Sequence, residues 1–232
     1  DNPPDPVTIM VTGSGGLSVS KWMNISFIQE VIACTTTIEK YIPETDVAIE
    51  LGGEDAKITF FDGDGGVDQR MNGSCAGGTG AFIDQMAALL QTDAQGVNEL
   101  AKSHKMIYPI AARCGVFAKT DIQPLLNEGA AREDIAASVF QSVVNQTISG
   151  LACGKTIKGN VAFLGGPLYF MSELRNRFIE TLKLTPEQVI FPENSQLFVA
   201  MGAALASKKE QVIEFKSLID KIPTLRDAHS DD

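Results

Sequence analysis

Two of the four cysteines stand where a thiolate could do chemistry. Cys75 opens the run Cys-Ala-Gly-Gly-Thr-Gly, ahead of a helix predicted from about Gly78, and Cys114 precedes a helix predicted over Phe117–Asn127. Free N–H groups and the positive dipole end at a helix N-terminus lower the pKa of a thiol and stabilise anionic sulfur. One chain with two such thiols cannot complete a four-cysteine iron–sulfur site, whereas two copies can. The alternative is that both thiols are buried and structural, as free cysteines usually are.

The other two thiols, Cys34 and Cys153, are expected to be buried and inert. The four cysteines are widely spread and form no Cys-x-x-Cys pair, which argues against a metal knuckle within one chain. A disulfide framework suits a short secreted chain and not one of 232 residues.

Glycine-rich turns offer a second kind of chemistry, because they let backbone N–H groups approach an anion closely. Three predicted strands each run into such a turn: Thr8–Thr12 into Gly13–Gly16, Val47–Leu51 into Gly52-Gly53, and Val161–Leu164 into Gly165-Gly166. Three turns of this kind predict a nucleotide cleft between two lobes. Glu54 and Asp55 follow the second turn directly, where carboxylates could hold Mg²⁺ and position an attacking water.

Two further patterns have simpler explanations. Gly154-Lys155-Thr156 resembles the end of a P-loop, but it follows a helix and the glycine required upstream is Ser149, so a helix-terminating glycine is favoured. Asp62–Gly66 resembles the start of a calcium loop but lacks the remaining ligands, so a hairpin turn is favoured.

The elements that must position these residues alternate between strands and helices, which predicts an α/β fold with a substantially parallel sheet. The strands are expected near 47–51, 57–61, 67–71, 161–164 and 188–191. Apolar spacing predicts further helices over Phe27–Ile38, Ile135–Leu151, Ser172–Leu182 and Ala200–Ala206, with one amphipathic helix in the tail from Lys208 to Asp232.

Composition excludes several classes of protein. The chain is 44% hydrophobic and 21% charged, enough to bury a core, which argues against disorder. Its net charge of −10 and the lack of a basic patch argue against nucleic-acid binding. No apolar run approaches the ~20 residues of a membrane span, and the opening lacks the features of a signal peptide, so we expect a cytoplasmic protein.

The motifs together resemble the activators (activases) of 2-hydroxyacyl-CoA dehydratases and the related ATPase subunits of benzoyl-CoA reductase, especially the large multidomain members. The Cys-Ala-x-Gly-Thr-Gly block with Cys-x-Val-Phe-Ala is highly specific, whereas the glycine pairs alone are weak. The matching blocks fall in family order: VTGSGG at 11–16, IELGGEDAK at 49–57, MNGSCAGGTGAFID at 71–84, ARCGVFAKTDI at 112–122, FLGGP at 163–167 and MGAALA at 201–206.

This resemblance implies an actin-like (ribonuclease H-like) ATPase with ATP, Mg²⁺ and a [4Fe-4S] cluster as cofactors. It implies a homodimer that shares one cluster, ligated by Cys75 and Cys114 of each chain, and ATP-driven transfer of one electron to an acyl-CoA dehydratase or reductase. Gly52, Gly53 and Asp55 match the second phosphate loop of the family, and Gly165 and Gly166 match its adenosine loop. Glu54 replaces the usual glutamine, which leaves its role in positioning water open.

The family also begins with a phosphate hairpin of the form Asp-x-Gly-Ser/Thr, and no such segment precedes Val11. We therefore interpret residues 1–45 as the remnant of an N-terminal lobe, 46–207 as a C-terminal actin-like lobe with the cluster-binding helices, and 208–232 as a helix and linker. This chain alone is expected to bind ATP weakly or not at all and to have little ATPase activity, whereas an intact parent should be active.

Two other functions remain open on the sequence alone. A sugar or carboxylate kinase of the same fold would need a substrate-binding acid/base aspartate in the first lobe, but not thiols at two helix starts. A non-catalytic lobe for dimerisation or docking within a larger protein would need neither nucleotide nor iron.

Overall fold

The computed structural model describes residues 6–63, 65–72, 78–111, 115–210 and 212–219, and these form two compact units. Glu44–Gln196 make up what we call the central unit, and the described parts of Asp1–Pro43 and Leu197–Asp232 make up the terminal unit. The predicted lobe boundaries near 45 and 207 differ from this division at the second position. The segment after Leu197 groups with the N-terminal residues because its helix packs there, as described below.

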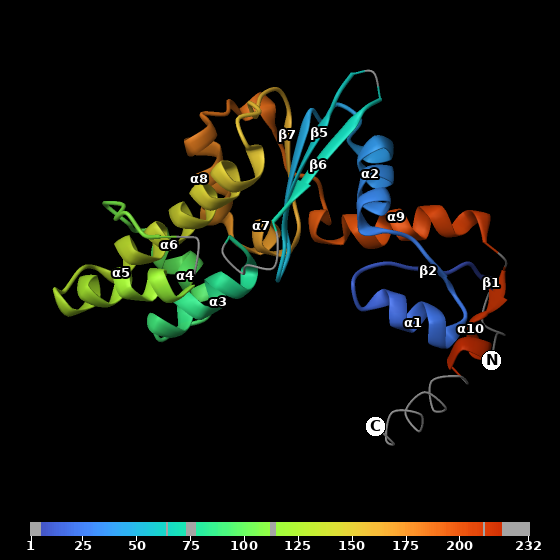
Figure 1. Ribbon diagram of the computed structural model, residues 1–232, viewed down its shortest axis with the longest axis horizontal. Helices are drawn as coiled ribbons and strands as arrows, with labels where there is room; N and C mark the ends of the chain where they lie inside the picture. Colours follow the sequence, from blue (N-terminus) through green and yellow to red (C-terminus); the bar gives the residue numbers. More distant parts are fainter. Residues whose placement is uncertain (1–5, 64, 73–77, 112–114, 211, 220–232) are drawn as a thin grey trace. The chain divides into compact units, whose positions relative to one another are not determined.

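A five-stranded sheet forms the centre of the central unit (Figure 1). Its strand order is β6-β5-β4-β7-β8, with β4 at Val47–Leu51, β5 at Ala56–Phe61, β6 at Val67–Met71, β7 at Val161–Leu164 and β8 at Val189–Ile190. All five strands predicted for this unit are therefore confirmed. The sheet is mixed, however, and not substantially parallel: β4, β7 and β8 are parallel, whereas β5 and β6 run antiparallel to their neighbours. The reason is local, since short turns connect β4 to β5 and β5 to β6 and can only return the chain antiparallel.

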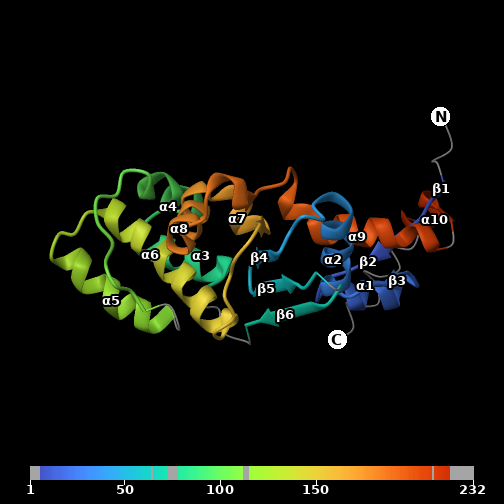
Figure 2. The same cartoon turned by 90° about the horizontal axis from the view of Figure 1, so that it is seen from above.

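The helices of the central unit all lie on one face of this sheet (Figures 1 and 2). They are α3 at Gly80–Leu89, α4 at Ala94–Ala101, α5 at Gly115–Asn127, α6 at Arg132–Thr147, α7 at Gly166–Phe170 and α8 at Ser172–Leu182, with a short 3-10 turn at Pro186–Gln188. Helix α6 packs against both α4 and α8, and its apolar side chains are fully buried. The largest fully buried rings in the core are Phe82, Phe140, Phe163 and Phe178.

Asp134, in the first turn of α6, anchors the extended segment that precedes α5. Its Oδ1 accepts hydrogen bonds from the backbone N–H groups of Lys105, at 2.6 Å, and Met106, at 3.1 Å. These two donors stabilise the carboxylate and hold the pKa of Asp134 below its usual value.

We expect this anchor to make stability depend on pH. A carboxylate with a lowered pKa in the folded state adds stability above its unfolded pKa, near 3.8, and loses it as pH falls through the folded value. In urea titrations between pH 6 and pH 2, Asp134→Asn should therefore be less stable than wild type at pH 6, and the difference should shrink as the solution is acidified. A difference in unfolding free energy that stays constant over this range would contradict the assignment.

Helix α6 ends in a π-helical turn, Ile148–Ala152, followed by Cys153 at φ +45° and Gly154 at φ +83°. The glycine that precedes Lys155 therefore terminates a helix, as predicted, and does not belong to a P-loop. The expectation that Cys153 is buried is wrong: it is an exposed free thiol, because the chain turns at the surface here.

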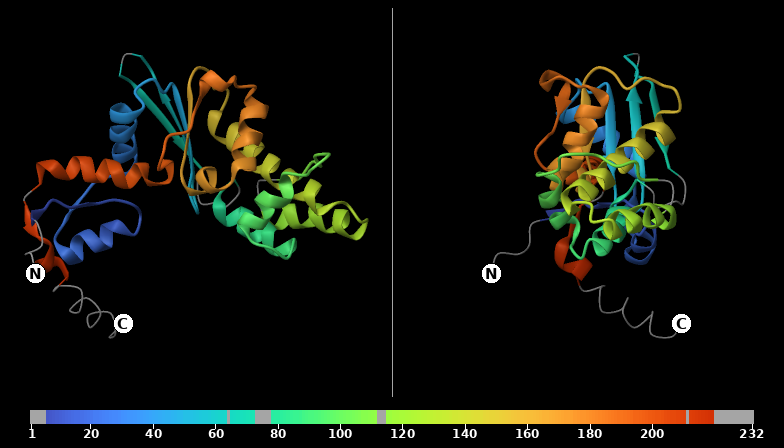
Figure 3. Two further views of the ribbon diagram at one scale, coloured as in Figure 1. Left: turned by 180° about the vertical axis from the view of Figure 1, so that it is seen from behind. Right: turned by 90° about the vertical axis from the view of Figure 1, so that its left-hand side faces the viewer.

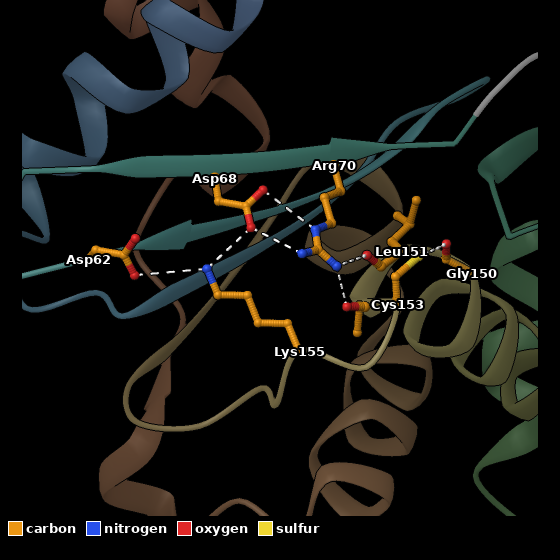
Figure 4. Close-up of polar contacts among 8 residues, drawn as sticks. Asp62, Asp68, Arg70, Gly150, Leu151, Cys153 and Lys155 are labelled. Atoms are coloured by element: carbon orange, nitrogen blue, oxygen red, sulfur yellow. Dashed lines mark hydrogen bonds and ion pairs between the residues drawn. The ribbon is translucent and has the colours of Figure 1, made fainter.

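Strand β6 is tied to this helix end by a cluster of charged side chains (Figure 4). Arg70 donates to the carbonyl oxygens of Leu151 and Ala152, and its guanidinium pairs with Asp68 at 3.1 Å. Lys155 pairs with the same carboxylate at 3.2 Å, and the hydrogen bonds from Arg70 and Lys155 lower the pKa of Asp68. The turn from Asp62 to Gly66 is the predicted hairpin turn, closed by a bond from Asp62 N to Gly66 O.

The described residues of the terminal unit form two small strand pairs and four α-helices, of which α2 and α9 cross. Its elements are β1 at Pro6–Val7, β2 at Met10–Val11, α1 at Gly16–Met23, β3 at Ser26–Phe27, α2 at Glu30–Tyr41, α9 at Phe198–Ala206, a 3-10 turn at Ser207–Lys209, β9 at Ile213–Glu214 and α10 at Phe215–Ile219. Strands β2 and β3 are parallel, and β1 and β9 are antiparallel. Phe27, expected to open a helix, lies instead in β3, and Cys34 is buried as predicted.

Helices α2 and α9 cross each other closely (Figure 3). A side chain at Gly202 would overlap the carbonyl oxygen of Ala33, so only glycine allows this approach. The Thr37 hydroxyl donates to the Phe198 carbonyl at 2.7 Å and fixes the pair. None of the helices among the described residues has both the length and the apolar character that crossing a membrane requires.

Candidate functional site

A cavity of about 560 Å³ lies in the central unit beside two of the glycine turns found in the sequence. It is lined by Gly53 and Glu54 from the β4–β5 turn, by Gly80, Ala81 and Asp84 from α3, by Ala94 and Gln95 from α4, and by Gly166, Pro167, Phe170 and Met171. Of the six residues predicted to bind or hydrolyse a nucleotide, Gly53, Glu54 and Gly166 therefore meet at one cavity. Gly52, Asp55 and Gly165 lie in the same turns but not on its wall.

The first turn is fixed to the start of helix α3. The carbonyl oxygens of Gly52 and Gly53 accept the N–H groups of Gly80, at 3.0 Å, and Ala81, at 2.8 Å. The turn itself is closed by a bond from Gly52 N to Asp55 O at 2.8 Å. Because of these hydrogen bonds, a displacement of this turn would also displace the first residues of α3.

The second turn packs against the end of strand β4. Gly165 has φ +90° and ψ 162°, a conformation that essentially only glycine adopts, and its N–H donates to Ser195 O at 3.2 Å. A Cβ at this position would overlap the Leu51 carbonyl oxygen and lie 2.9 Å from the Leu51 carbonyl carbon. The two glycine turns are therefore neighbours at the carboxyl ends of parallel strands β4 and β7, the edge where open α/β sheets bind ligands.

The two predicted carboxylates differ in their surroundings. Glu54 is exposed on the wall of the cavity. Asp55 is held by the ammonium group of Lys57, with Oδ2 and Nζ 3.0 Å apart. Lys57 is only 3% exposed and also pairs with Glu50 across the β4–β5 ladder at 3.2 Å. Asp55 is thus oriented by a buried cation in strand β5, which follows the glycine turn.

Asp84 and Phe170 also line the cavity, although the sequence patterns did not single out either residue. Asp84 is a polar residue within the apolar α3 sequence, one turn after Gly80, and Phe170 lies one turn after Gly166. This one-turn spacing from a glycine was the feature of the sequence that could have indicated that both residues line the cavity. For Phe170 that signal was hidden, because the five-residue helix α7 was not predicted.

Cys75 and Cys114 lie outside the described residues, so their approach at an exposed edge stays a prediction. The helices that follow them are described: α3 begins at Gly80 and α5 at Gly115, and the two helices contact each other. A Cβ at Gly115 would lie 2.5 Å from Oε1 of Gln85 in α3. Within the part of the chain that the structure describes, no group of three or more His, Cys, Asp or Glu side chains is arranged to hold a metal ion.

Comparison with known families gives a match to the BadF/BadG/BcrA/BcrD ATPase family over residues 4–207. This chain belongs to that family. The resemblance found in the sequence is confirmed, and the family's actin-like ATPase fold agrees with the mixed α/β sheet described above.

Related proteins of the family are similar over most of the chain. The 2-hydroxyisocaproyl-CoA dehydratase activator of Clostridioides difficile is 32% identical over 90% of this chain and 78% of its own length. The activator of lactoyl-CoA dehydratase of Anaerotignum propionicum is 32% identical over 77% of this chain and 67% of its own length.

Two solved structures of activators resemble this one closely. Component A of the (R)-2-hydroxyglutaryl-CoA dehydratase of Acidaminococcus fermentans gives a TM-score of 0.77 at 28% identity, over 87% of this chain and 76% of that one. The activator of the 2-hydroxyisocaproyl-CoA dehydratase from Clostridium difficile, solved with bound ADPNP, gives 0.73 at 28% identity, over 95% of this chain and 76% of that one.

Proposed function

We propose that this chain is an ATP-dependent activator of an acyl-CoA dehydratase or reductase. The observation that carries the proposal is the cavity at which Gly53, Glu54 and Gly166 meet next to helix α3, in a chain of an ATPase family. The similar proteins are named as activators of 2-hydroxyacyl-CoA dehydratases, which supports a dehydratase as the partner. No feature of the described residues favours a sugar or carboxylate kinase.

In this proposal the Gly52-Gly53 turn binds the phosphates of ATP, and the Gly165-Gly166 turn, which matches the adenosine loop, binds its nucleoside part. Gly53 and Gly166 carry no side chain that would block the backbone, and a Cβ at either position would meet no atom within 4 Å. Their N–H groups can therefore approach a bound nucleotide closely. Glu54 and Asp55 are the carboxylates proposed to hold Mg²⁺ through water and to orient the attacking water, with Asp55 positioned by Lys57.

The same turn links the nucleotide to helix α3. Binding or loss of the terminal phosphate at Gly53 would shift carbonyl groups that are bonded to Gly80 and Ala81. The start of α3 is three residues beyond the segment 73–77 that contains Cys75, so movement at the turn is proposed to reach this thiol.

The donor chemistry of Cys75 and Cys114 fits an iron–sulfur cluster. Each thiol precedes a helix N-terminus, two per chain make four in a two-fold dimer, and the described start of α5 lies against α3. We therefore propose a homodimer in which both residues of each chain hold one [4Fe-4S] cluster. Such a cluster supplies a one-electron donor when it is bound. We propose the cytoplasm as the location, where thiols stay reduced.

Filling the cavity should abolish nucleotide binding without unfolding the protein. Gly53→Val and Gly166→Val each place a side chain into open space on the cavity wall, so we expect at least about a tenfold loss of affinity for Mg-ATP, roughly 1.4 kcal/mol. Isothermal titration calorimetry of the full-length protein measures this loss.

Gly63→Val is the matched control. A Cβ added at Gly63 would also meet no atom within 4 Å, but this residue lies in the β5–β6 turn away from the cavity. The affinity of this variant for ATP should equal that of wild type. Unchanged affinity in both cavity variants would show that the nucleotide binds elsewhere and would overturn the proposed site.

A further inference from the structure

The end of helix α6 carries a buried hydroxyl group that has no partner among the described residues. Thr147 is the last residue of α6, it is only 2% exposed, and its Oγ1 makes no hydrogen bond to any of them. A hydroxyl buried in this way has lost its hydrogen bonds to water without gaining others, which destabilises the fold. Such a group indicates an interaction that the described residues do not supply.

The hydroxyl groups on either side of Thr147 bond to their own helix. Ser142 donates to the Val139 carbonyl at 2.7 Å. Ser149, in the π-helical turn, donates to the Asn145 carbonyl at 2.6 Å. A local bond of this kind is usual for serine and threonine within a helix. Because Thr147 does not make one, its hydroxyl is left free to serve a partner outside the helix.

The Thr147 hydroxyl lies against the backbone that leads to Cys75. A Cβ added at Gly78 would be 3.4 Å from Thr147 Oγ1 and 3.5 Å from Cγ of Gln146, and Gly78 has φ +85°. Gly78 is the first described residue after the segment 73–77, which contains Cys75. Three residues of chain span at most about 11 Å, so the hydroxyl is within reach of that segment.

Neighbouring elements fix both the hydroxyl and the other end of this segment. A π-helical turn, which is frequent at functional sites, follows Thr147 directly, and Arg70 of β6 donates to two of its carbonyl groups (Figure 4). Asn72, directly before the segment, accepts the Ala56 N–H through Oδ1 at 2.8 Å. The donor is therefore held beside the segment before any cofactor binds.

We propose that Thr147 is a positioning residue whose hydroxyl donates a hydrogen bond to the Cys75 thiolate when the cluster is bound. The inference rests on the proposed function and adds a residue that acts through one of the proposed ligands. A thiolate that holds iron keeps negative charge and lone pairs, so it accepts a hydroxyl donor well. A hydrogen bond to sulfur stabilises the reduced, more negative state more than the oxidised state and so raises the reduction potential.

The test measures the reduction potential of the full-length protein after anaerobic reconstitution. Thr147→Val replaces the hydroxyl by a methyl group of similar size and should keep the iron content of wild type, since Thr147 is not a ligand. Its potential should be lower by about 20–60 mV, which is roughly a 2- to 10-fold change in the redox equilibrium at 59 mV per tenfold. A redox titration followed by electron paramagnetic resonance measures this shift.

Two further variants separate the hydroxyl from other effects of substitution. Thr147→Ser keeps the hydroxyl and should retain the potential of wild type. Ser142→Ala is the matched control, because it removes a buried hydroxyl of the same helix whose partner is already the Val139 carbonyl. Its potential should equal that of wild type.

The apoprotein gives a second measurement that does not depend on iron. Because the Thr147 hydroxyl has no partner among the described residues, its replacement by a methyl group removes an unpaired polar group. Thr147→Val without iron should therefore melt at or above the temperature of wild type in differential scanning fluorimetry.

The outcomes separate this inference from the proposed function. If wild type takes up no iron, the proposed cluster fails, and the role of Thr147 fails with it. If iron-loaded Thr147→Val has the potential of wild type, the inference is wrong while the cluster ligands stand. A lower melting temperature of the Thr147→Val apoprotein, together with an unchanged potential, would show that the hydroxyl only supports the fold and would also overturn the inference.

Discussion

Gly165→Ala is expected to destabilise the central unit more than an alanine substitution at any other glycine of the two glycine turns. The backbone of Gly165 is in a region that costs other residues about 1–3 kcal/mol, and the new Cβ would also overlap the Leu51 carbonyl oxygen. Overpacking of this kind adds about 1–3 kcal/mol. The melting temperature should therefore fall by about 4 °C or more, at roughly 2–4 °C per kcal/mol for a chain of this size.

Gly166→Ala is the control for this experiment. The next residue along the chain has open space around a Cβ, so its melting temperature should stay within about 2 °C of wild type. Differential scanning fluorimetry measures both variants. If Gly165→Ala melted with wild type, the close approach of the β7–α7 turn to β4 would be contradicted. Because that approach brings the two glycine turns together, loss of nucleotide binding should accompany the loss of stability.

Strands β4 and β7 of the central unit could be predicted because each is a short apolar run that ends at a pair of glycines. Val47–Leu51 and Val161–Leu164 have the predicted bounds, and α8 begins and ends where its apolar spacing indicated. The glycines were informative because a chain that leaves a buried strand must turn at once. The directions of the strands were less predictable: the alternation of strands and helices indicated a substantially parallel sheet, whereas short turns make β5 and β6 antiparallel to their neighbours.

The errors occur where tertiary contacts override local pattern. Phe27 continues the apolar stripe of the following helix, yet it pairs with Val11 in a two-residue parallel strand. Helix α9 has the small residues of a tightly packed helix, as expected, but the sequence did not indicate that α2 is the element against which it packs. Cys153 follows a buried helical stripe, and its exposure depends on a turn at positive φ that hydrophobicity does not encode.

The candidate site shows the same division. Glycine turns and adjacent carboxylates can be recognised in sequence because the chemistry restricts the residue types. The rest of the cavity wall cannot be recognised in this way, since Phe170 and Asp84 come from helices that only the fold brings together. Lys57 is a third example: its role in orienting Asp55 follows from β4–β5 register and burial, neither of which is visible in a single strand.

The largest effect on cofactor content is expected at Cys75 and Cys114. A [4Fe-4S] cluster needs four thiolates, and a two-fold dimer of this chain supplies four from these two positions. Helix N-termini favour a thiolate by roughly 0.3–1 kcal/mol even before iron binds. After anaerobic reconstitution, wild type should be brown and contain about four iron atoms per dimer, whereas Cys75→Ser and Cys114→Ser should each lose the iron.

The remaining cysteines provide matched controls for that experiment. Cys34 is 5% exposed inside the terminal unit, and Cys153 is a free thiol at the surface. Cys34→Ser and Cys153→Ser should therefore keep the iron and sulfide content of wild type, as measured by colorimetric assay and by absorbance near the charge-transfer bands of the cluster. Because serine in a buried site can unfold a protein, circular dichroism should accompany the Cys34 variant. Iron loss in a folded Cys34 or Cys153 variant, or iron retained in either ligand variant, would overturn the assignment of Cys75 and Cys114 as the cluster ligands.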